Sequence, residues 1–239
     1  MPIIPILSTI VTFIFAVSVL NRYRRRKGTH LLLWGIGLIF YGLGTLSEVL
    51  MAIAFSPLVM KVWYISGAML TAAWLGQGTV WLLFRKPGFA RVSTYILTAL
   101  SLLAVFLVFM APISPAAASY NTAAPISEQY KEILVRGSAI IILTILLNIY
   151  GTLTLVGGAI YSAYLFFRKR VLINRVIGNI LIAAGALFPA MAGSFVGAGM
   201  VDMLYLSELI GVVLMYAGFL QATISRPAVQ NPAASSAAD

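Results

Sequence analysis

The sequence predicts an all-α integral membrane protein that forms a bundle of seven transmembrane helices. Three observations support this prediction. Hydrophobic residues make up 61% of the 239 residues and charged residues 9%, with a mean hydropathy of +1.00, far from the values of a soluble domain. Seven apolar runs are each long enough to cross a hydrocarbon core of about 30 Å. The basic residues gather in alternate gaps between these runs.

The seven predicted spans follow one another along most of the chain. In order they cover residues 3–20, 31–55, 62–84, 92–110, 135–167, 176–199 and 203–224. Positive charges follow the first apolar run instead of preceding it, which is typical of an uncleaved anchor and not of a signal peptide. We therefore predict a transmembrane domain at residues 1–226 and a disordered cytoplasmic tail at 227–239, where Ala, Ser and Pro predominate.

Charge distribution predicts the orientation of the bundle. Thirteen of the 16 Lys and Arg residues follow the first, third, fifth or seventh predicted span: Arg22, Arg24, Arg25, Arg26, Lys27, Arg85, Lys86, Arg91, Arg168, Lys169, Arg170, Arg175 and Arg226. Cytoplasmic loops are enriched in Lys and Arg, so we expect an outside amino terminus and a cytoplasmic carboxyl terminus in a plasma or inner cell membrane. The basic loops are expected to contact anionic lipid headgroups, and nucleic acid is not an expected partner because topology explains the net charge of +10.

The longest connection, residues 111–134, joins the fourth and fifth spans and should lie outside. Its second half is predicted to form a short helix with Ser127 as the amino-terminal cap and Glu128 in the first turn. The sequence allows two interpretations, a lid over an outer cavity or an ordinary exposed loop.

A weak internal repeat relates the first three spans to the last three. At an offset of about 142 residues, Gly35 aligns with Gly178, and after two residues of slippage Tyr64 aligns with Tyr205. An even number of spans separates the partners, so the two halves would run in the same direction, a parallel 3+1+3 arrangement with the fourth span as linker. Chance recurrence of Gly and Arg at similar depths is the alternative.

Two carboxyl groups lie inside predicted spans, those of Glu48 and Glu208. Each stands about 7 Å from the outer end of its span, and equal depth allows the two to meet. Two neighbouring carboxyls in a low dielectric cannot both ionise cheaply, so one should keep a proton. Such a pair suits proton coupling or a cationic ligand, with Lys61 and Arg136 as candidate counter-charges. A protonated Glu that only fixes helix packing is the alternative.

Several further residues are candidates for the same ligand or proton site. At helical spacing Glu48 is accompanied by Tyr41 and Thr45, and Glu208 by Tyr205. An aromatic and polar cavity below the two Glu residues is expected to be lined by Tyr64, Trp74, Gln77 and Asn148. The alternative is that the aromatic residues belong to a belt at the membrane interface and that the amides only join neighbouring helices. Pro189, in the middle of the sixth span, is a candidate hinge.

Composition argues against an enzyme. The chain has no Cys and a single His, His30, which predicts no metal site and no thiol or haem chemistry. No phosphate-binding loop or hydrolase motif is present, and the middle of the last span, residues 211–216, lacks the Lys that a retinal Schiff base requires. No cofactor is expected.

We therefore predict a non-enzymatic membrane protein that binds or transports a small solute, with proton coupling through the buried carboxyls as an option. The alternative is a sensory or accessory subunit that acts through protein partners without transport. A lipid or pigment carrier is a third interpretation, because 12% of the residues are aromatic.

Overall fold

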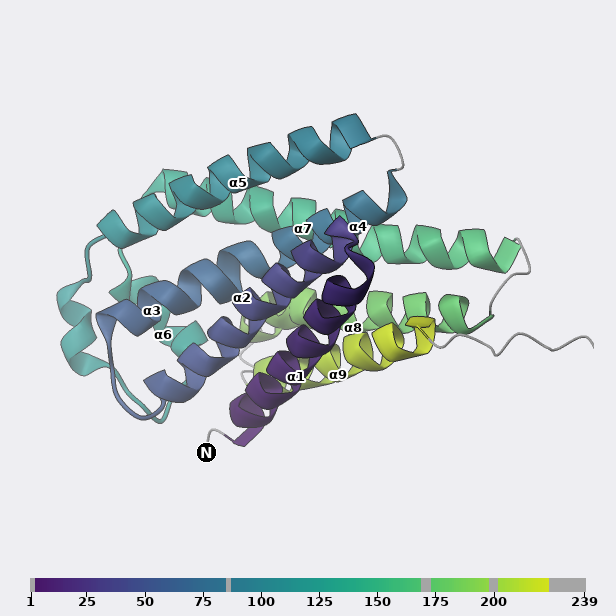
Figure 1. Cartoon of the computed structure of the whole chain (residues 1–239). Helices are drawn as coiled ribbons and strands as arrows, with labels where there is room; N and C mark the ends of the chain where they lie inside the picture. The colour runs from purple at the N-terminus through teal and green to yellow at the C-terminus, as the bar shows by residue number, and fades with distance from the viewer. Residues whose placement is uncertain (1–2, 85–86, 169–172, 198–201, 224–239) are drawn as a thin grey trace, which may run out of the picture.

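The computed structural model describes residues 3–84, 87–168, 173–197 and 202–223 (Figure 1). The described residues are helical and form no strand, apart from an isolated bridge between Ile113 and Leu134. The α-helices are α1 (Ile3–Arg26), α2 (Thr29–Met51), α3 (Pro57–Trp63), α4 (Thr71–Leu83), α5 (Pro87–Met110), α6 (Ile126–Ile133), α7 (Ser138–Arg168), α8 (Ile173–Gly197) and α9 (Asp202–Thr223). A π-helix, η1 (Tyr64–Leu70), joins α3 to α4, and a 3₁₀-helix, η2 (Pro115–Ser119), precedes α6.

Six of these elements are long and apolar enough to cross a membrane. They are α1, α2, the continuous run α3–η1–α4, α5, α7 and α9. In α8 the apolar stretch found among the described residues, Ile173–Pro189, is shorter. The fold is therefore all-helical, with six helices that support a multi-pass membrane protein.

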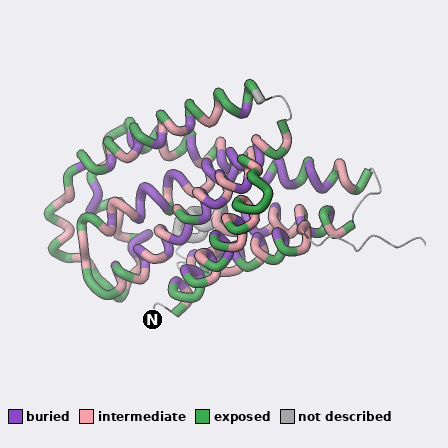
Figure 2. The backbone as a smooth tube through the Cα atoms, in the orientation of Figure 1, coloured by how far each residue is buried: buried purple, intermediate pink, exposed green. Residues whose placement is uncertain are grey.

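Six helices form a closed ring. Each of α1, α2, α4, α7, α8 and α9 contacts the next in this order, and α9 returns to contact α1. Helix α5 lies outside the ring against α4, η1 and α7 (Figure 1). Its apolar window is the least buried of the six, and its outward side is exposed along its length (Figure 2). The ring leaves a space between its helices, and α5 does not reach it.

Glycine allows the helices of the ring to approach closely. A Cβ atom added to Gly44 of α2 would lie 2.9 Å from the Cα atom of Gly67 in η1. On the other side of the ring, a Cβ added to Gly185 of α8 would lie 2.6 Å from the carbonyl oxygen of Gly211 in α9. Real side chains do not fit at such distances, so these backbones touch directly, as is usual between membrane helices.

The π-helix η1 interrupts what the sequence predicted to be a single regular span. Side chains bind two backbone carbonyls of this widened turn, and the Ser66 carbonyl also accepts the Thr71 N–H. Asn148 Nδ2 donates to the Ala68 carbonyl at 2.7 Å, and Thr71 Oγ1 donates to the Ser66 carbonyl at 2.8 Å. Such π segments are frequent at functional sites.

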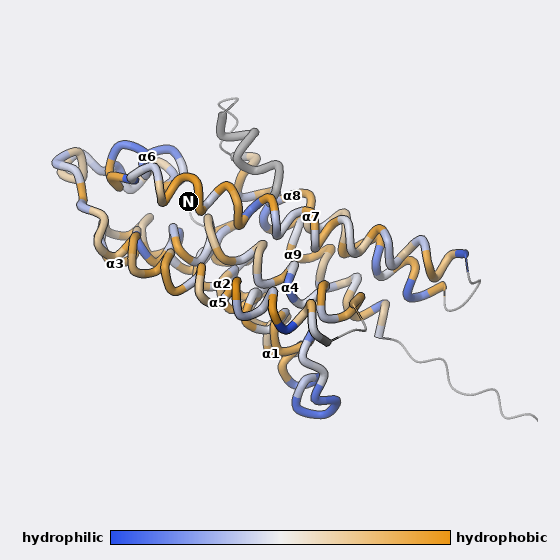
Figure 3. The backbone as a smooth tube through the Cα atoms, turned by 90° about the horizontal axis from the view of Figure 1, so that it is seen from above, coloured by the Kyte–Doolittle hydropathy of each residue, from blue (hydrophilic) through white to orange (hydrophobic). Residues whose placement is uncertain are grey.

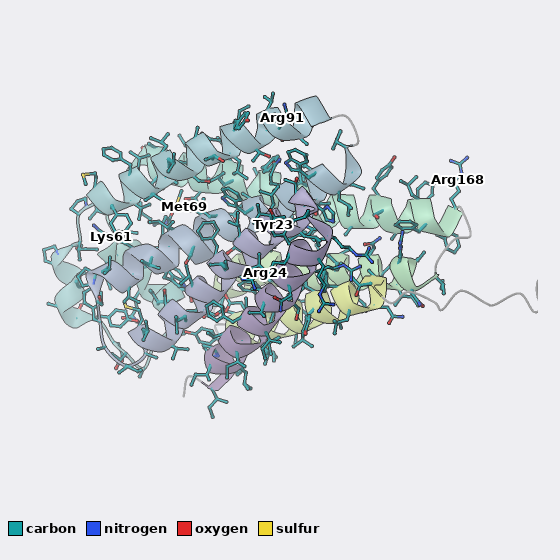
Figure 4. All side chains as sticks on the ribbon, in the orientation of Figure 1. Tyr23, Arg24, Lys61, Met69, Arg91 and Arg168 are labelled. Carbon is teal, nitrogen blue, oxygen red and sulfur yellow. The ribbon has the colours of Figure 1, made fainter. Side chains whose placement is uncertain are left out.

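Polar residues gather at the two ends of the bundle (Figure 3). One end carries α6, and Lys61 lies near it; we call it the α6 end (Figure 4). Arg91 and Arg168 lie toward the opposite end, which we call the basic end (Figure 4). Five of the predicted basic residues, Arg85, Lys86, Lys169, Arg170 and Arg226, and the predicted tail at 227–239 lie outside the described residues.

Several predicted boundaries were wrong. The second span ends at Met51 instead of residue 55, because Ser56 and Pro57 start α3: Ser56 Oγ accepts a hydrogen bond from the Val59 N–H, and Pro57 fits the first helical turn. The predicted outer helix exists as α6, with Glu128 in its first turn. Ser127 does not cap it, because the helix starts at Ile126 and the cap position is Pro125.

Candidate solute site

A cavity of about 400 Å³ lies within the ring near the α6 end; we call it the ring cavity. Its polar wall includes Tyr41, Thr45 and Glu48 of α2, Trp63 of α3, Thr71 of α4, Asn148 and Thr152 of α7 and Glu208 of α9. Small and apolar residues of α2, η1, α4, α7, α8 and α9 form the rest of the wall, and Ser127, Tyr130 and Lys131 of α6 line it at the α6 end. Its volume is within the range of small-molecule sites.

The structure brings Glu48 and Glu208 together. Their carboxyl groups lie within hydrogen-bonding reach of each other, although they come from α2 and α9. Glu48 is 4% exposed, and its Oε1 atom accepts a hydrogen bond from Trp63 Nε1 at 3.1 Å. The Oε2 atoms of both residues are buried and have no hydrogen-bond partner in the protein.

This geometry requires a proton between the two carboxyls. An ionised carboxylate only accepts hydrogen bonds, so two ionised groups at this separation repel each other in a medium that screens poorly. A proton on one of them turns the repulsion into a strong hydrogen bond. The indole N–H of Trp63 stabilises negative charge on Glu48, so the proton belongs on Glu208. The pair then carries one net negative charge inside the ring cavity.

Tyr41 and Thr45 support the carboxyl pair from the same face of α2. The Tyr41 hydroxyl donates to the Glu208 carbonyl at 2.9 Å, which ties α2 to α9 across the cavity. Thr45 Oγ1 accepts from Thr9 Oγ1 of α1 at 2.9 Å. Both residues line the cavity, as their spacing from Glu48 predicted.

Two more candidates lie around the cavity in different ways. Asn148 lines it and donates to the Ala68 carbonyl of η1, as described above. Tyr64 is 1% exposed and is a packing residue beside the cavity: its hydroxyl pairs with Thr144 Oγ1 at 3.0 Å and its ring lies 5.7 Å from the ring of Tyr130.

Trp74 and Gln77 do not face the ring cavity, so this part of the prediction was wrong. Trp74 Nε1 donates to Ser101 Oγ of α5 at 3.1 Å. Gln77 Nε2 donates to three oxygen atoms of α5, at 2.8 Å in the closest case, and Gln77 Oε1 accepts from the Tyr150 hydroxyl. Both side chains attach α4 to α5, which lies outside the ring.

The expected counter-charges also bind elsewhere. Lys61 Nζ donates to the Phe109 carbonyl at 2.8 Å, and the Arg136 guanidinium stacks over the ring of Tyr130 at 4.7 Å. Lys131 of α6, which the sequence did not single out, lines the ring cavity and is exposed. Pro189 lines the cavity from α8; its role as a hinge stays a prediction.

A second pocket of about 350 Å³, which we call the loop pocket, lies under residues 120–126. Glu48 lines both pockets, so it stands at the boundary between them. The loop pocket also contains Tyr205, one of the predicted site residues, together with Tyr120. Sequence reasoning missed Tyr120 because nothing in a Pro- and Ala-rich loop indicates which residues turn inward.

Comparison of the chain with known protein families, characterised proteins and solved structures finds no match. The geometry of the site therefore carries the functional argument.

Proposed function

We propose that the protein binds a small solute in the ring cavity and moves it across the membrane, coupled to a proton held by Glu48 and Glu208. The observation that carries the proposal is the carboxyl pair itself: both residues line the cavity, and each has a buried Oε2 atom without a hydrogen-bond partner in the protein. Burying such groups is costly, and membrane proteins retain them chiefly along ion and substrate pathways.

We also propose that α8 crosses the membrane as the seventh span and that the α6 end faces outward. The described basic residues Arg91 and Arg168 at the basic end support this orientation, because cytoplasmic ends are enriched in Lys and Arg. The ring cavity would then be nearer the outside of a plasma or inner membrane. The basic end would contact anionic lipid headgroups on the cytoplasmic side.

The order of helices in the ring supports a parallel 3+1+3 repeat. In this repeat α1, α2 and α3–α4 correspond to α7, α8 and α9. A two-fold axis through the centre of the ring then relates the contact between α4 and α7 to the contact between α9 and α1. The glycine contacts favour a different alignment from the predicted one. Gly37 and Gly44 of α2 pack on the third span in the way that Gly178 and Gly185 of α8 pack on α9, so these two pairs would align. Gly35, which the predicted alignment paired with Gly178, packs on α1 instead. Sites on such folds tend to lie between the halves, as the ring cavity does.

A pH-jump experiment tests the proposal. Purified protein in phosphatidylcholine vesicles is adsorbed on a solid-supported membrane, and the current that follows a step in external pH is recorded. We expect a transient current that the double variant Glu48→Gln/Glu208→Gln abolishes, because an amide cannot exchange the proton. The matched control, Glu128→Gln/Glu132→Gln, changes two exposed carboxyls of α6 and should leave the current intact.

Two outcomes would contradict proton coupling. One is an unchanged current in the folded Glu48→Gln/Glu208→Gln variant, since the charge would then move elsewhere. The other is no current in the unmodified protein. Stable co-purification of another chain in that case would favour a sensory or accessory subunit.

A further inference from the structure

The loop pocket has a rigid roof. Gln129 of α6 binds the backbone of the segment above the pocket: its Nε2 donates to the Asn121 and Ala124 carbonyls at 2.9 and 3.0 Å, and its Oε1 accepts from the Asn121 N–H at 2.8 Å. The ring of Tyr120 leans on that of Phe55, with 5.1 Å between their centroids. A preformed pocket loses little entropy when it binds a ligand.

The chemistry of the loop pocket is that of a cation site. Glu48 is the charged residue in its described lining, and two tyrosines, Tyr120 and Tyr205, stand beside it. Small or apolar residues such as Pro5 and Ala52 complete much of the wall. Aromatic faces attract cations, and a buried carboxylate with an unpartnered oxygen adds a full negative charge.

Other titratable groups near Glu48 do not cancel this charge. They are Glu208 and Tyr205 of α9, Tyr41 of α2 and Tyr120 of the loop. The cation that shares the ring cavity with Glu48, Lys131 of α6, is an exposed residue, so solvent screens its charge. Burial and the nearby Glu48 carboxyl raise the pKa of Tyr120 to about 12, so its phenol is neutral at physiological pH. Glu208 holds the shared proton in the arrangement derived above.

We infer that the loop pocket binds an organic ammonium ion, which passes from there to the carboxyl pair through the boundary at Glu48. This inference rests on the proposed function and names its substrate class. A divalent metal ion fits less well, because it requires several oxygen ligands and no group of three acidic or His side chains occurs among the described residues. An alkylated ammonium ion is weakly hydrated and needs only rings and one carboxylate.

Saturation-transfer NMR tests the inference with tetramethylammonium chloride as the probe. The protein is placed in nanodiscs of phosphatidylcholine, whose zwitterionic headgroups keep non-specific attraction of the cation low. We expect signal transfer to the methyl protons of tetramethylammonium and none to neopentyl alcohol, a neutral molecule of similar shape. Equal transfer to both compounds would overturn the inference, because the pocket would then select apolar bulk and not charge.

Variants locate the binding. Tyr120→Leu and Tyr205→Leu each remove one ring and should weaken tetramethylammonium binding by roughly 3- to 30-fold, whereas Tyr120→Phe keeps the ring and should bind nearly as well. Glu48→Gln should weaken it at least as much. The control is Tyr95→Leu, at a position on α5 that is 67% exposed. Equal binding by the control and by the Tyr120 and Tyr205 variants would place the ion elsewhere and refute the inference.

The two proposals fail separately. A proton current without tetramethylammonium binding would refute the ammonium site and leave the carboxyl mechanism standing. Tetramethylammonium binding that depends on Tyr120, without a proton current, would keep the site and refute coupled transport.

Discussion

Gly151→Ala should separate α7 from α4 and so test whether their contact holds the ring cavity closed. A Cβ atom at residue 151 would lie 2.3 Å from the carbonyl carbon of Ala72 and 2.6 Å from the Ala73 nitrogen. These are backbone atoms and cannot rotate away. Ordinary contacts between such atoms begin at about 3.5 Å, so one helix must retreat by about 1 Å. The hydrogen bond of Asn148 to the Ala68 carbonyl crosses the same interface and should weaken with it.

We expect this substitution to lower the free energy of unfolding by about 2–4 kcal/mol. Overpacking contributes about 1–3 kcal/mol and the weakened hydrogen bond about 1 kcal/mol. The assay is unfolding by increasing SDS in mixed micelles, followed by tryptophan fluorescence. Gly157→Ala is the matched control on the same helix, since a Cβ there meets nothing within 4 Å. It should be neutral or stabilising by up to about 1 kcal/mol. Equal stability of the two variants would refute the close contact between α4 and α7.

Three further results are expected. Gln77→Leu removes a buried amide with bonds to α5 and should destabilise the protein by about 2–3 kcal/mol in the SDS assay, while the pH-jump current per folded molecule stays unchanged. Tyr120 should ionise near pH 12 in an ultraviolet titration, Tyr120→Phe should remove this ionisation step, and Glu48→Gln should lower its midpoint pH. The free energy of folding that the protonated phenol contributes is complete below pH 10 and is lost as pH rises through 12. The chain has no Cys, so the variants Thr122→Cys and Arg24→Cys report the orientation of the protein directly. A membrane-impermeant maleimide added to intact cells should label only the Thr122→Cys variant, and labelling of only the Arg24→Cys variant would overturn the proposed topology.

The main features of the carboxyl pair could be predicted from the sequence. Charged residues are rare in apolar spans, so Glu48 and Glu208 stand out, and equal depth is easily counted from the span ends. The same reasoning placed Tyr41 and Thr45 correctly on the face of Glu48, because residues three, four or seven positions apart on one α-helix share a face. Length and apolar composition likewise identified six of the helices.

Partners across helices could not be predicted in this way. Lys61 and Arg136 were assigned to the carboxyls by charge alone, yet Lys61 donates to a backbone carbonyl and the Arg136 guanidinium lies over aromatic rings. The partner that Glu48 does have, Trp63, looks from the sequence like a residue of the interfacial belt. Neutral donors are too common in a membrane protein for pattern alone to select one of them.

The π-helix explains why one predicted face of the third span divides into two. An inserted residue rotates everything after it by roughly 100° relative to a regular α-helix. Before and within η1, Trp63 and Ala68 reach the ring cavity; beyond it, Trp74 and Gln77 turn to α5. Helix α5 is the least buried of the six, and the hydrogen bonds of Trp74 and Gln77 at membrane depth add to the apolar packing of its Leu97, Ala104 and Val108. The distortion in η1 thus has two consequences: it leaves Gly67 and Ala68 on the cavity side, and it turns Trp74 and Gln77 to the side where their hydrogen bonds attach α5.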